Sequence, residues 1–236
     1  MQVVILTGGL GTRARQLSPD LPKSLIEIDS KPFISYQFDL LVKQGFKEIL
    51  LCTGYKGDKI SEYVGNGSRF GLHVSYSNEE PDKLLGTGGA ILNAIDFLSS
   101  EFLVIYGDSY LDINYEKVKE KYYQSGLDSL MVIYKNINQY DDSNVEFDGS
   151  RIIRYSKNNR TTKMDFIDYG INIYKKEIFS RYNGPKNFDL SEIQESLVEK
   201  QLVAAYETNK RFYHIGDETA FDEFDKMIKG KKYDNN

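Results

Sequence analysis

The chain has 236 residues, of which 40% are hydrophobic and 13% are aromatic. A chain of this length buries about 70–75% of its unfolded surface, so we expect an ordinary globular protein. Its 30 Lys and Arg residues stand against 35 Asp and Glu residues, and the net charge of −5 argues against binding of nucleic acid or anionic membranes through bulk positive charge.

Short β-branched segments alternate with longer amphipathic segments through the first half of the chain. Strands are expected at residues 2–6, 48–53, 74–77, 102–106 and 129–134. Helices are expected at residues 33–43, 58–64, 89–98 and 115–124. The run that contains Cys52 is apolar on both faces, which is typical of a parallel strand covered by helices, so this only cysteine is expected to be a buried thiol without a disulfide partner. The alternation predicts a Rossmann-like α/β fold, with a mixed, mainly parallel central sheet and helices on both faces.

The pattern changes in the second half, where Asp148 and Gly149 separate two short apolar runs. This arrangement predicts an antiparallel hairpin excursion from the sheet. The remaining elements are expected as a strand at 167–174, a helix at 190–200, a strand at 202–207 and a closing helix at 219–229.

One domain is expected over residues 1–229, because no linker-like stretch interrupts them. Residues 230–236 are polar and are expected to form a disordered tail. No apolar run reaches the length of a membrane span and no signal peptide is visible, so we expect a cytoplasmic protein.

A glycine-rich segment follows the first strand, at the end where open α/β sheets bind ligands. Its glycines would let backbone N–H groups approach a phosphate, while a threonine hydroxyl and two cations add donors. A tight turn beside surface cations is the structural alternative. The candidate nucleotide-binding residues here are Leu6, Gly8, Gly9, Gly11, Thr12, Arg13 and Lys23.

Two other phosphate-binding motifs compete for this loop. A Walker A loop would end in Gly-Lys-Ser/Thr, but residues 13–15 read Arg-Ala-Arg. Residues 9–14 satisfy the dinucleotide pattern G-x-G-x-x-G/A, and Asp29 lies near the expected distance for a ribose-binding acid. That fold requires an uninterrupted helix after the loop, and Pro19 and Pro22 interrupt it, so a dinucleotide-dependent oxidoreductase is disfavoured.

The loop at residues 6–13 is followed by Pro-Lys-Ser-Leu at 22–25 and Lys-Pro-Phe at 31–33, and together these segments resemble the signature of the sugar-1-phosphate nucleotidyltransferases. The pattern of these segments resembles that of bacterial heptose-1-phosphate and mannose-1-phosphate guanylyltransferases. The similarity continues at residues 85–90 and 106–108 and, more faintly, at 168–170 and 213–216, so it covers most of the chain.

The resemblance implies transfer of a nucleoside monophosphate from an NTP, with GTP favoured, to a hexose or heptose 1-phosphate. Pyrophosphate is released, and the NDP-sugar would serve surface-polysaccharide synthesis. The second pKa of a phosphomonoester lies near 6, so the attacking oxygen is already ionised and no general base is needed. The site must instead supply cations and a divalent metal that offset the charge of two polyanions.

Arg13, Lys23 and Asp108 are the expected catalytic residues, and Asp108, at the end of the strand at 102–106, is the expected ligand of a Mg²⁺ cofactor. Relatives in this family usually carry a second acid in an Asp-x-Gly setting near the C-terminus, where this chain has His214. Either Asp217 takes over as a second metal ligand, or the metal relies on Asp108 and the phosphates.

Glu80, Gly86 and Thr87 are further candidates for nucleotide binding. A solvated loop position explains Glu80 equally well, and a glycine-rich helix entry is the structural alternative for Gly86 and Thr87. The resemblance places contacts to the sugar phosphate at Gly170, Asn172 and Glu192. For Asp189 and Ser191, just before that glutamate, helix capping competes with a binding role.

Two other functions remain open. The acceptor could be a non-sugar phosphomonoester, as for a cytidylyltransferase, or the chain could be a non-catalytic NTP-binding regulatory module. The expected partners are an NTP and a phosphorylated small molecule, without nucleic acid or membrane, and a homodimer is possible. The sequence fixes neither the base nor the acceptor.

Overall fold

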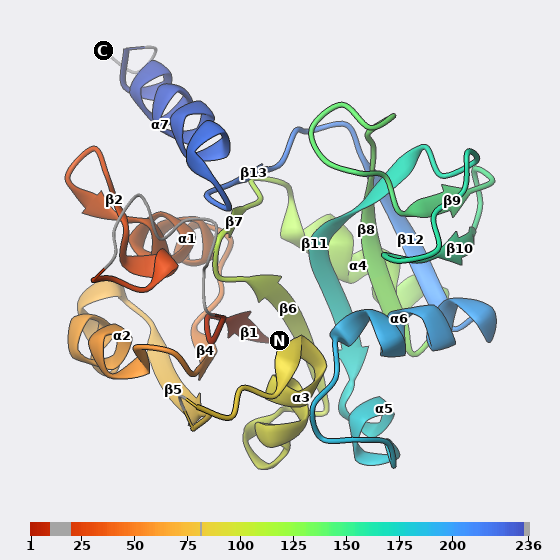
Figure 1. Cartoon of the computed structure of the whole chain (residues 1–236), viewed down its shortest axis with the longest axis horizontal. Coiled ribbons are helices and arrows are strands. Elements are labelled where there is room, and N and C mark those ends of the chain that lie inside the picture. Colours follow the sequence, from red (N-terminus) through yellow and green to blue (C-terminus); the bar gives the residue numbers. More distant parts are fainter. Residues whose placement is uncertain (10–19, 81, 234–236) are drawn as a thin grey trace.

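The computed structural model describes residues 1–9, 20–80 and 82–233, and these residues form a nine-stranded central sheet (Figure 1). Its first half is parallel: β1 (Gln2–Leu6) lies between β4 (Glu48–Thr53) and β6 (Glu101–Tyr106), and β5 (His73–Asn78) is the edge strand beside β4. The predicted Rossmann-like arrangement of strands and helices is confirmed.

The second half adds strands of both directions. The long strand β11 (Phe166–Lys175) runs antiparallel to β6 and to β8 (Ser129–Lys135), and β12 (Val203–Thr208) pairs parallel with β8. The predicted hairpin is formed by β9 (Val145–Phe147) and β10 (Ile152–Tyr155). The register between β11 and β8 shifts between Asp168 and Asn172, and Gly170 within this irregularity has a φ of +90°. The sheet is therefore mixed, as the sequence predicts.

Alternate residues of the central strands face two separate cores. Val3 and Ile5 of β1 belong to one core, which is covered by α1 (Phe33–Lys43), α2 (Gly57–Val64) and α4 (Tyr115–Ser125). Val4 and Leu6 belong to the other, which is covered by α3 (Gly86–Asn93), α5 (Lys176–Ser180) and α6 (Leu190–Glu199). Apolar side chains on both faces of a strand are what a sheet between two helical layers requires.

A third apolar cluster attaches the C-terminal helix. Phe224 and Ile228 of α7 (Glu218–Tyr233) pack against Phe33 and against Ile28 of β2 (Glu27–Ile28), a short strand that pairs with β3 (Lys31–Pro32). The helix continues beyond the predicted domain end at residue 229, and an ion pair of 2.9 Å joins Lys231 to Asp112. The prediction of a disordered tail is therefore wrong for residues 230–233, because these residues belong to α7. Residues 234–236 lie outside the described part of the chain.

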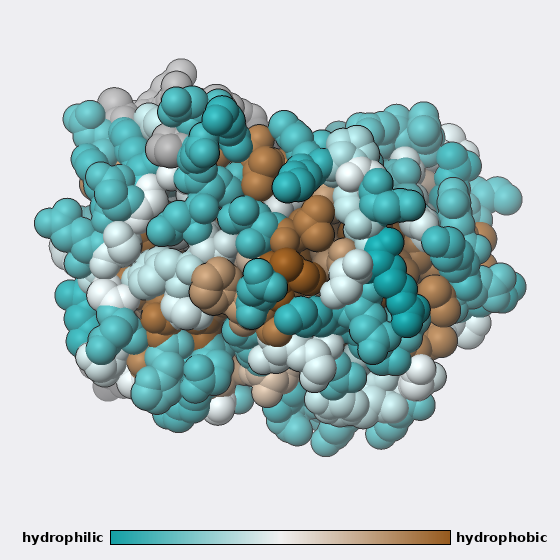
Figure 2. All heavy atoms as spheres, turned by 90° about the horizontal axis from the view of Figure 1, so that it is seen from below, coloured by the Kyte–Doolittle hydropathy of each residue, from teal (hydrophilic) through white to brown (hydrophobic). Residues whose placement is uncertain are grey.

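The surface is mostly polar. Seen from below, Figure 2 shows apolar side chains near the centre of the face, surrounded by hydrophilic ones. Among the described residues, the large apolar side chains that are strongly exposed come from separate elements: Phe97, Tyr123, Ile137 and Ile153. None of the described helices combines the length and apolar character needed to cross a membrane.

Candidate active site

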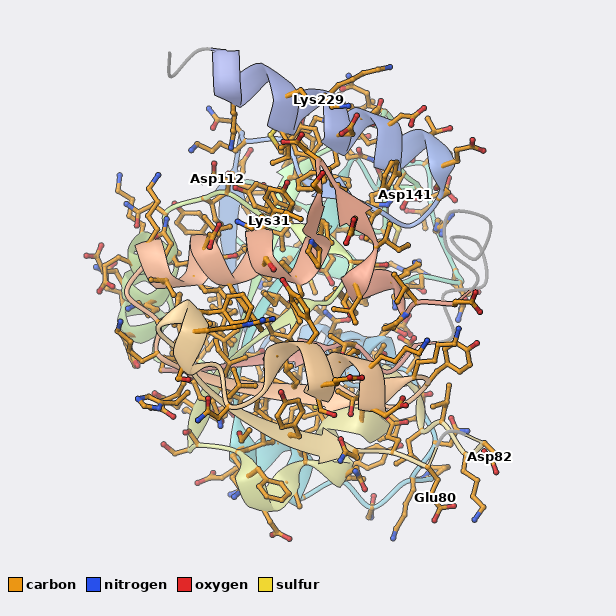
Figure 3. The ribbon with its side chains drawn as sticks, turned by 90° about the vertical axis from the view of Figure 1, so that its left-hand side faces the viewer. Lys31, Glu80, Asp82, Asp112, Asp141 and Lys229 are labelled. Atoms are coloured by element: carbon orange, nitrogen blue, oxygen red, sulfur yellow. The ribbon has the colours of Figure 1, made fainter. Side chains whose placement is uncertain are left out.

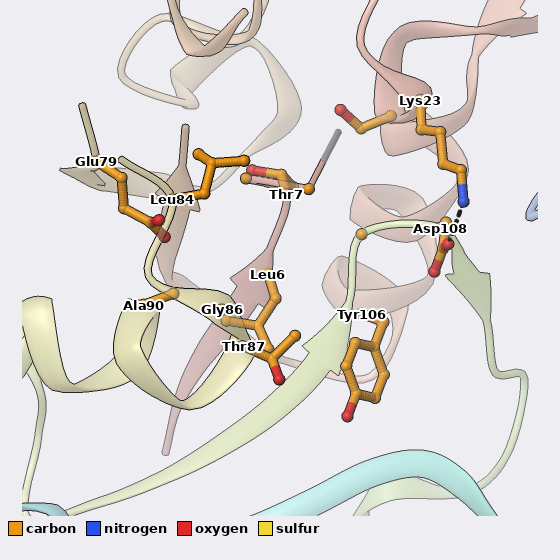
Figure 4. A pocket seen from close by; sticks show the side chains of 14 residues that line it. Leu6, Thr7, Lys23, Glu79, Leu84, Gly86, Thr87, Ala90, Tyr106 and Asp108 are labelled. Atoms are coloured by element: carbon orange, nitrogen blue, oxygen red, sulfur yellow. Dashed lines mark hydrogen bonds and ion pairs between the residues drawn. The ribbon is translucent and has the colours of Figure 1, made fainter. Parts of the chain in front are cut away.

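A cavity of about 260 Å³ opens at the C-terminal ends of β1 and β6 (Figure 4). Strand ends, the entry of α3 and the short helix η2 (Lys23–Leu25) contribute to its walls. The residues that line it are Leu6, Thr7, Gly8, Gly9, Lys23, Ser24, Glu79, Leu84, Gly86, Thr87, Ala90, Tyr106, Gly107 and Asp108. It lies at the edge of the sheet where the sequence predicts the phosphate-binding loop.

The chain after β6 passes close to the end of β1 because the residue at the point of contact is a glycine. Leu6 is the register partner of Tyr106, and the next residue, Gly107, donates its N–H to the Leu6 carbonyl at 2.9 Å. A Cβ on Gly107 would lie 2.6 Å from Cγ2 of Thr7. Only glycine permits this approach, which places Asp108 beside the start of the first loop.

Lys23 and Asp108 form the polar end of the cavity. Nζ of Lys23 lies 2.9 Å from Oδ2 of Asp108, and the two side chains are 20% and 31% exposed. Burial raises the pKa of the Asp108 carboxyl, but the charge and hydrogen bond of the Lys23 ammonium outweigh burial and hold this pKa below its usual value. The site therefore presents an ionised carboxylate at neutral pH, already paired with a cation.

The donor set at Asp108 fits Mg²⁺ only as one protein carboxylate completed by other oxygens. The part of the chain that the structure describes contains no group of three or more His, Cys, Asp or Glu side chains that could hold a metal. Mg²⁺ is commonly bound through one or two carboxylates together with substrate phosphates and water. Asp108, an ionised carboxylate that already attracts a cation, meets that requirement.

Asp217, the other predicted metal ligand, is not brought to Asp108. Its Oδ1 accepts the N–H of Ala220 at 3.0 Å and caps the start of α7, and the residue lines a separate cavity. His214 lies nearer, because β13 (Tyr213–His214) pairs with β7 (Ser109–Tyr110) directly after Asp108. The histidine thus occupies the position beside Asp108 that the resemblance assigns to the second acid.

The described residues include the start of the first glycine loop, up to Gly9. Gly8 and Gly9 line the cavity, and the Gly8 carbonyl accepts the N–H of Tyr55 at 3.2 Å. A Cβ on Gly9 would meet no atom of the described residues within 4 Å. Three predicted ligands of the phosphates lie outside the described residues: Gly11, Thr12 and Arg13.

The second glycine loop is attached to the segment that precedes α6. Gly86 has a φ of +73°, and a Cβ there would lie 2.5 Å from the carbonyl oxygen of Phe188. That carbonyl accepts the N–H groups of Gly88 and Gly89, at 3.1 and 3.3 Å, so these two amides are already bonded. Oγ1 of Thr87 accepts the N–H of Leu190 at 2.8 Å, although Gly86 and Thr87 both still line the cavity.

Of two adjacent glutamates, the structure brings Glu79 into the cavity and not the predicted Glu80. The Glu80 side chain is 71% exposed and pairs with Lys83 at 2.7 Å, and Figure 3 shows it at the outer edge of the molecule. Oε2 of Glu79 accepts the N–H of Leu85 at 2.7 Å, while burial raises the pKa of its carboxyl. Strand pairing decides which glutamate faces the cavity, since the Glu79 N–H continues the β4–β5 ladder to the carbonyl of Thr53.

The predicted sugar-phosphate residues do not gather in one place. Asn172 is buried and donates to Oδ1 of Asp168 at 3.2 Å, and the same oxygen accepts the Gly170 N–H at 2.9 Å. Gln194 donates to the other Asp168 oxygen at 2.9 Å, and burial raises the pKa of this carboxyl. Asp168 therefore organises this polar group. A Cβ on Gly170 would lie 3.4 Å from Cδ2 of Tyr106, which lines the cavity, so Gly170 lies close to the cavity wall.

Glu192 lies elsewhere and has a structural role. Its carboxylate accepts the N–H of Asp189 at 3.3 Å, while Oδ1 of Asp189 accepts the N–H of Ser191 at 2.8 Å, which together form a capping box at the start of α6. Glu192 lines a different cavity, with Lys175 and Arg181. The capping alternative for this segment is thus the one that the contacts support.

A family model described as "Nucleotidyl transferase" matches residues 2–227. The chain is 32% identical to a D-glycero-alpha-D-manno-heptose 1-phosphate guanylyltransferase of Campylobacter jejuni, over 92% of this chain and 95% of the relative. It is also 32% identical to an enzyme of the same name from Aneurinibacillus thermoaerophilus, over 90% and 88% of the two chains. A crystal structure of HddC from Yersinia pseudotuberculosis in complex with GMP-PN superposes with a TM-score of 0.78 at 28% identity, over 96% and 99% of the two chains.

These matches extend over nearly the whole chain and include the strands, loops and helices that form the cavity. The predicted resemblance to sugar-1-phosphate nucleotidyltransferases is therefore confirmed, and the chain belongs to the nucleotidyl transferase family.

Proposed function

We propose that this chain transfers the guanylyl group of GTP to the phosphate of a sugar 1-phosphate, with a heptose 1-phosphate as the favoured acceptor. An oxygen of the sugar phosphate attacks the α-phosphorus of GTP, the bond from that phosphorus to the β-phosphate oxygen breaks, and pyrophosphate leaves with its electrons. The observation that carries the proposal is the Lys23–Asp108 pair at the end of β6, beside the glycine loop of β1. The two heptose-1-phosphate guanylyltransferases support the choice of substrates.

The charges of the cavity suit two polyanions. Lys23 lies at 2.9 Å from Asp108 and can turn its ammonium to phosphate oxygens when a triphosphate enters, which frees the carboxylate. A divalent cation such as Mg²⁺, held there by Asp108 and phosphate oxygens, would offset the negative charge of the α-phosphate and of the departing pyrophosphate. Arg13, beyond the described residues, stays a predicted third cation.

Glu79 suits a base that presents N–H donors, and the choice of guanine among such bases rests on the two heptose-1-phosphate guanylyltransferases. An ionised carboxylate is an acceptor only, and guanine presents N–H donors at its N1 and N2 atoms. One Glu79 oxygen is already bonded to the Leu85 N–H, so the other is available to a base that enters the cavity. Adenine would meet this carboxylate with an acceptor nitrogen at N1, so we expect ATP to bind more weakly.

The direct test offers the purified chain GTP, UTP, CTP, dTTP or ATP with Mg²⁺ and a panel of acceptors, and measures pyrophosphate release. The panel includes heptose, mannose and glucose 1-phosphates and one non-sugar phosphomonoester, phosphocholine. GTP with a sugar 1-phosphate is expected to react, and Asp108→Ala is expected to slow the reaction at least about 10³-fold. Asp112→Ala, a surface acid paired with Lys231, is the matched control that keeps activity.

The other outcomes separate the alternatives. Reaction only with phosphocholine would favour the non-sugar acceptor, and GTP binding by calorimetry without turnover would favour a regulatory module. We further propose that the GDP-sugar serves surface-polysaccharide synthesis in the cytoplasm and that the chain forms a homodimer. Sedimentation equilibrium tests the dimer, and a monomer at all concentrations contradicts it.

A further inference from the structure

His214 is held next to Asp108 by backbone pairing. In the two-stranded ladder of β13 and β7, His214 is the register partner of Ser109, and the N–H of Ile215 donates to the Asp108 carbonyl at 2.9 Å. Figure 1 shows this small ladder between α7 and β11, so β13 reaches Asp108 from the C-terminal half of the chain. The position of the imidazole is thus fixed by two strands.

One nitrogen of this imidazole is already used. The N–H of Gly216 donates to Nδ1 of His214 at 3.0 Å. A Cβ on Gly216 would lie 2.8 Å from the same nitrogen, so the contact depends on the absence of a side chain. A nitrogen that accepts a hydrogen bond carries no proton, and neutral histidine carries its proton on one of the two nitrogens. The proton of neutral His214 is therefore on Nε2.

This tautomer has no nitrogen free for a metal. The lone pair of Nδ1 points to Gly216, and Nε2 carries a hydrogen, so the ring offers a donor where a second carboxylate would offer an acceptor. Mg²⁺ also prefers oxygen ligands to imidazole nitrogen. The residue at this position is thus suited to an anion.

His214 lines a second cavity, which Asp108 does not line. This cavity has a volume of about 410 Å³ and also contains Tyr140 and Arg211. The buried Nε of Arg211 has no hydrogen-bond partner among the described residues. The nucleotide candidates Glu79 and Gly86 lie at the opposite end of the first cavity from Asp108 (Figure 4). His214 thus connects the 410 Å³ cavity, which it lines, with Asp108, beside which its strand pairs, and we assign this side to the acceptor because the nucleotide candidates lie at the other end.

We propose that His214 binds the phosphate of the sugar 1-phosphate through its Nε2–H and does not ligate the metal, so that Asp108 is the metal's one carboxylate among the described residues. The inference rests on the proposed function for the identity of the acceptor. His214, which stands where relatives carry an acid, would thus bind the acceptor phosphate.

Nuclear magnetic resonance tests the tautomer without turnover. The chain has two histidines, and His73 lies on the edge strand β5, so His73→Gln leaves His214 as the single ¹⁵N-labelled histidine. We expect Nδ1 to resonate as an unprotonated acceptor and Nε2 as a protonated donor, with no change of tautomer on addition of Mg²⁺. Addition of mannose 1-phosphate should shift Nε2 and not Nδ1. Protonation at Nδ1, or a Mg²⁺-induced shift of Nε2, would overturn the proposal.

Metal binding gives a second readout. Electron paramagnetic resonance measures free Mn²⁺ during titration of the nucleotide-free protein. His214→Ala should leave the Mn²⁺ dissociation constant nearly unchanged, whereas Asp108→Asn should raise it by about tenfold or more. His214→Asp should tighten binding, because it adds a carboxylate beside Asp108. Loss of Mn²⁺ affinity in His214→Ala equal to that in Asp108→Asn would identify His214 as a ligand.

Kinetics identify which phosphate is bound. His214→Ala should lower kcat/KM for the sugar 1-phosphate by about 10- to 100-fold, as expected for a hydrogen bond to a charged group. His214→Gln, which keeps an N–H donor at a similar reach, should regain most of that loss. A rise confined to the KM for GTP would contradict the acceptor assignment. If the wild-type chain transfers nothing, the proposed function fails, while the tautomer and the Mn²⁺ titration still decide the role of His214.

Discussion

Nζ of Lys23 lies 2.9 Å from Oδ2 of Asp108, across 85 positions of sequence. The pair joins the segment after β1 to the end of β6, and both groups are partly shielded from water. In the protein without substrate, each charge therefore stabilises the other, and the carboxylate is kept ionised for its later role.

Removal of the cation from this pair is expected to destabilise the fold. Lys23→Met leaves Asp108 without its cation and should lower the free energy of unfolding by about 1–2 kcal/mol, less than a fully buried pair because water screens both groups. Urea denaturation at pH 7 measures the change. The double variant Lys23→Met/Asp108→Asn should recover part of this loss, and an additive loss would show that the pair contributes nothing.

Glu79→Gln is expected to weaken selection of guanine. The amide replaces one acceptor oxygen by a donor, so the KM for GTP should rise by about tenfold or more, while the KM for ATP changes little. Glu80→Gln is the matched control, because that side chain is exposed and pairs with Lys83. Steady-state pyrophosphate release with both nucleotides gives the ratio of the KM for GTP to the KM for ATP. Equal effects of the two substitutions on this ratio would show that Glu79 does not recognise the base.

Asp189 makes part of the stability depend on pH. The Lys157 ammonium at 2.9 Å and the hydrogen bonds from Ser191 outweigh burial and lower the pKa of Asp189 to about 2. A depressed folded-state pKa contributes stability that is complete above the unfolded pKa, near 4, and is lost as the pH falls toward 2.

Asp189→Ala should therefore destabilise the protein at pH 7 by about 1 kcal/mol, mainly through the lost cap, and the difference from wild type should shrink below pH 4. Asp189→Asn keeps the cap without the charge and separates the two contributions. Thermal unfolding followed by circular dichroism at pH 7, 4 and 3 measures them. A difference that stays constant with pH would assign the whole effect to capping.

Cys52 should react only when the protein unfolds. Its side chain is 1% exposed, and burial, with a smaller effect of Glu79, raises the pKa of the thiol to about 12. Since the thiolate is the reactive form, we expect no colour from a disulfide reagent in buffer and one equivalent in guanidinium chloride. Rapid labelling of the native protein, at a rate similar to that of free cysteine, would show that β4 opens.

Local patterns predicted the parts of this fold that depend on neighbours in sequence. The apolar run that contains Cys52 predicted a strand covered on both faces, and Asp148-Gly149 predicted the hairpin of β9 and β10, because each pattern reflects a local backbone preference. The Asp189-x-x-Glu192 spacing also predicts a capping box on its own, so the capping role of Glu192 was readable from the sequence.

Contacts between residues far apart in sequence determine the features that local patterns did not predict. Which of Glu79 and Glu80 faces the cavity depends on the ladder between β4 and β5, and no local pattern contains that register. The helical residues after Lys229 include Lys231, which pairs with Asp112 far away in sequence, and composition alone does not show this contact. The family was evident from the glycine loops, whereas the placement of Asp217 away from Asp108 required the fold.

The carbonyl of Phe188 accepts the N–H groups of both Gly88 and Gly89, while the N–H of Leu190 donates to Thr87. The first turn of α3, which borders the nucleotide, is thereby fastened to the first turn of α6, which packs on the second half of the sheet. A shift of α6 must carry the nucleotide wall with it. A displacement of the first turn of α6 would consequently reshape the part of the cavity wall that Gly86 and Thr87 form.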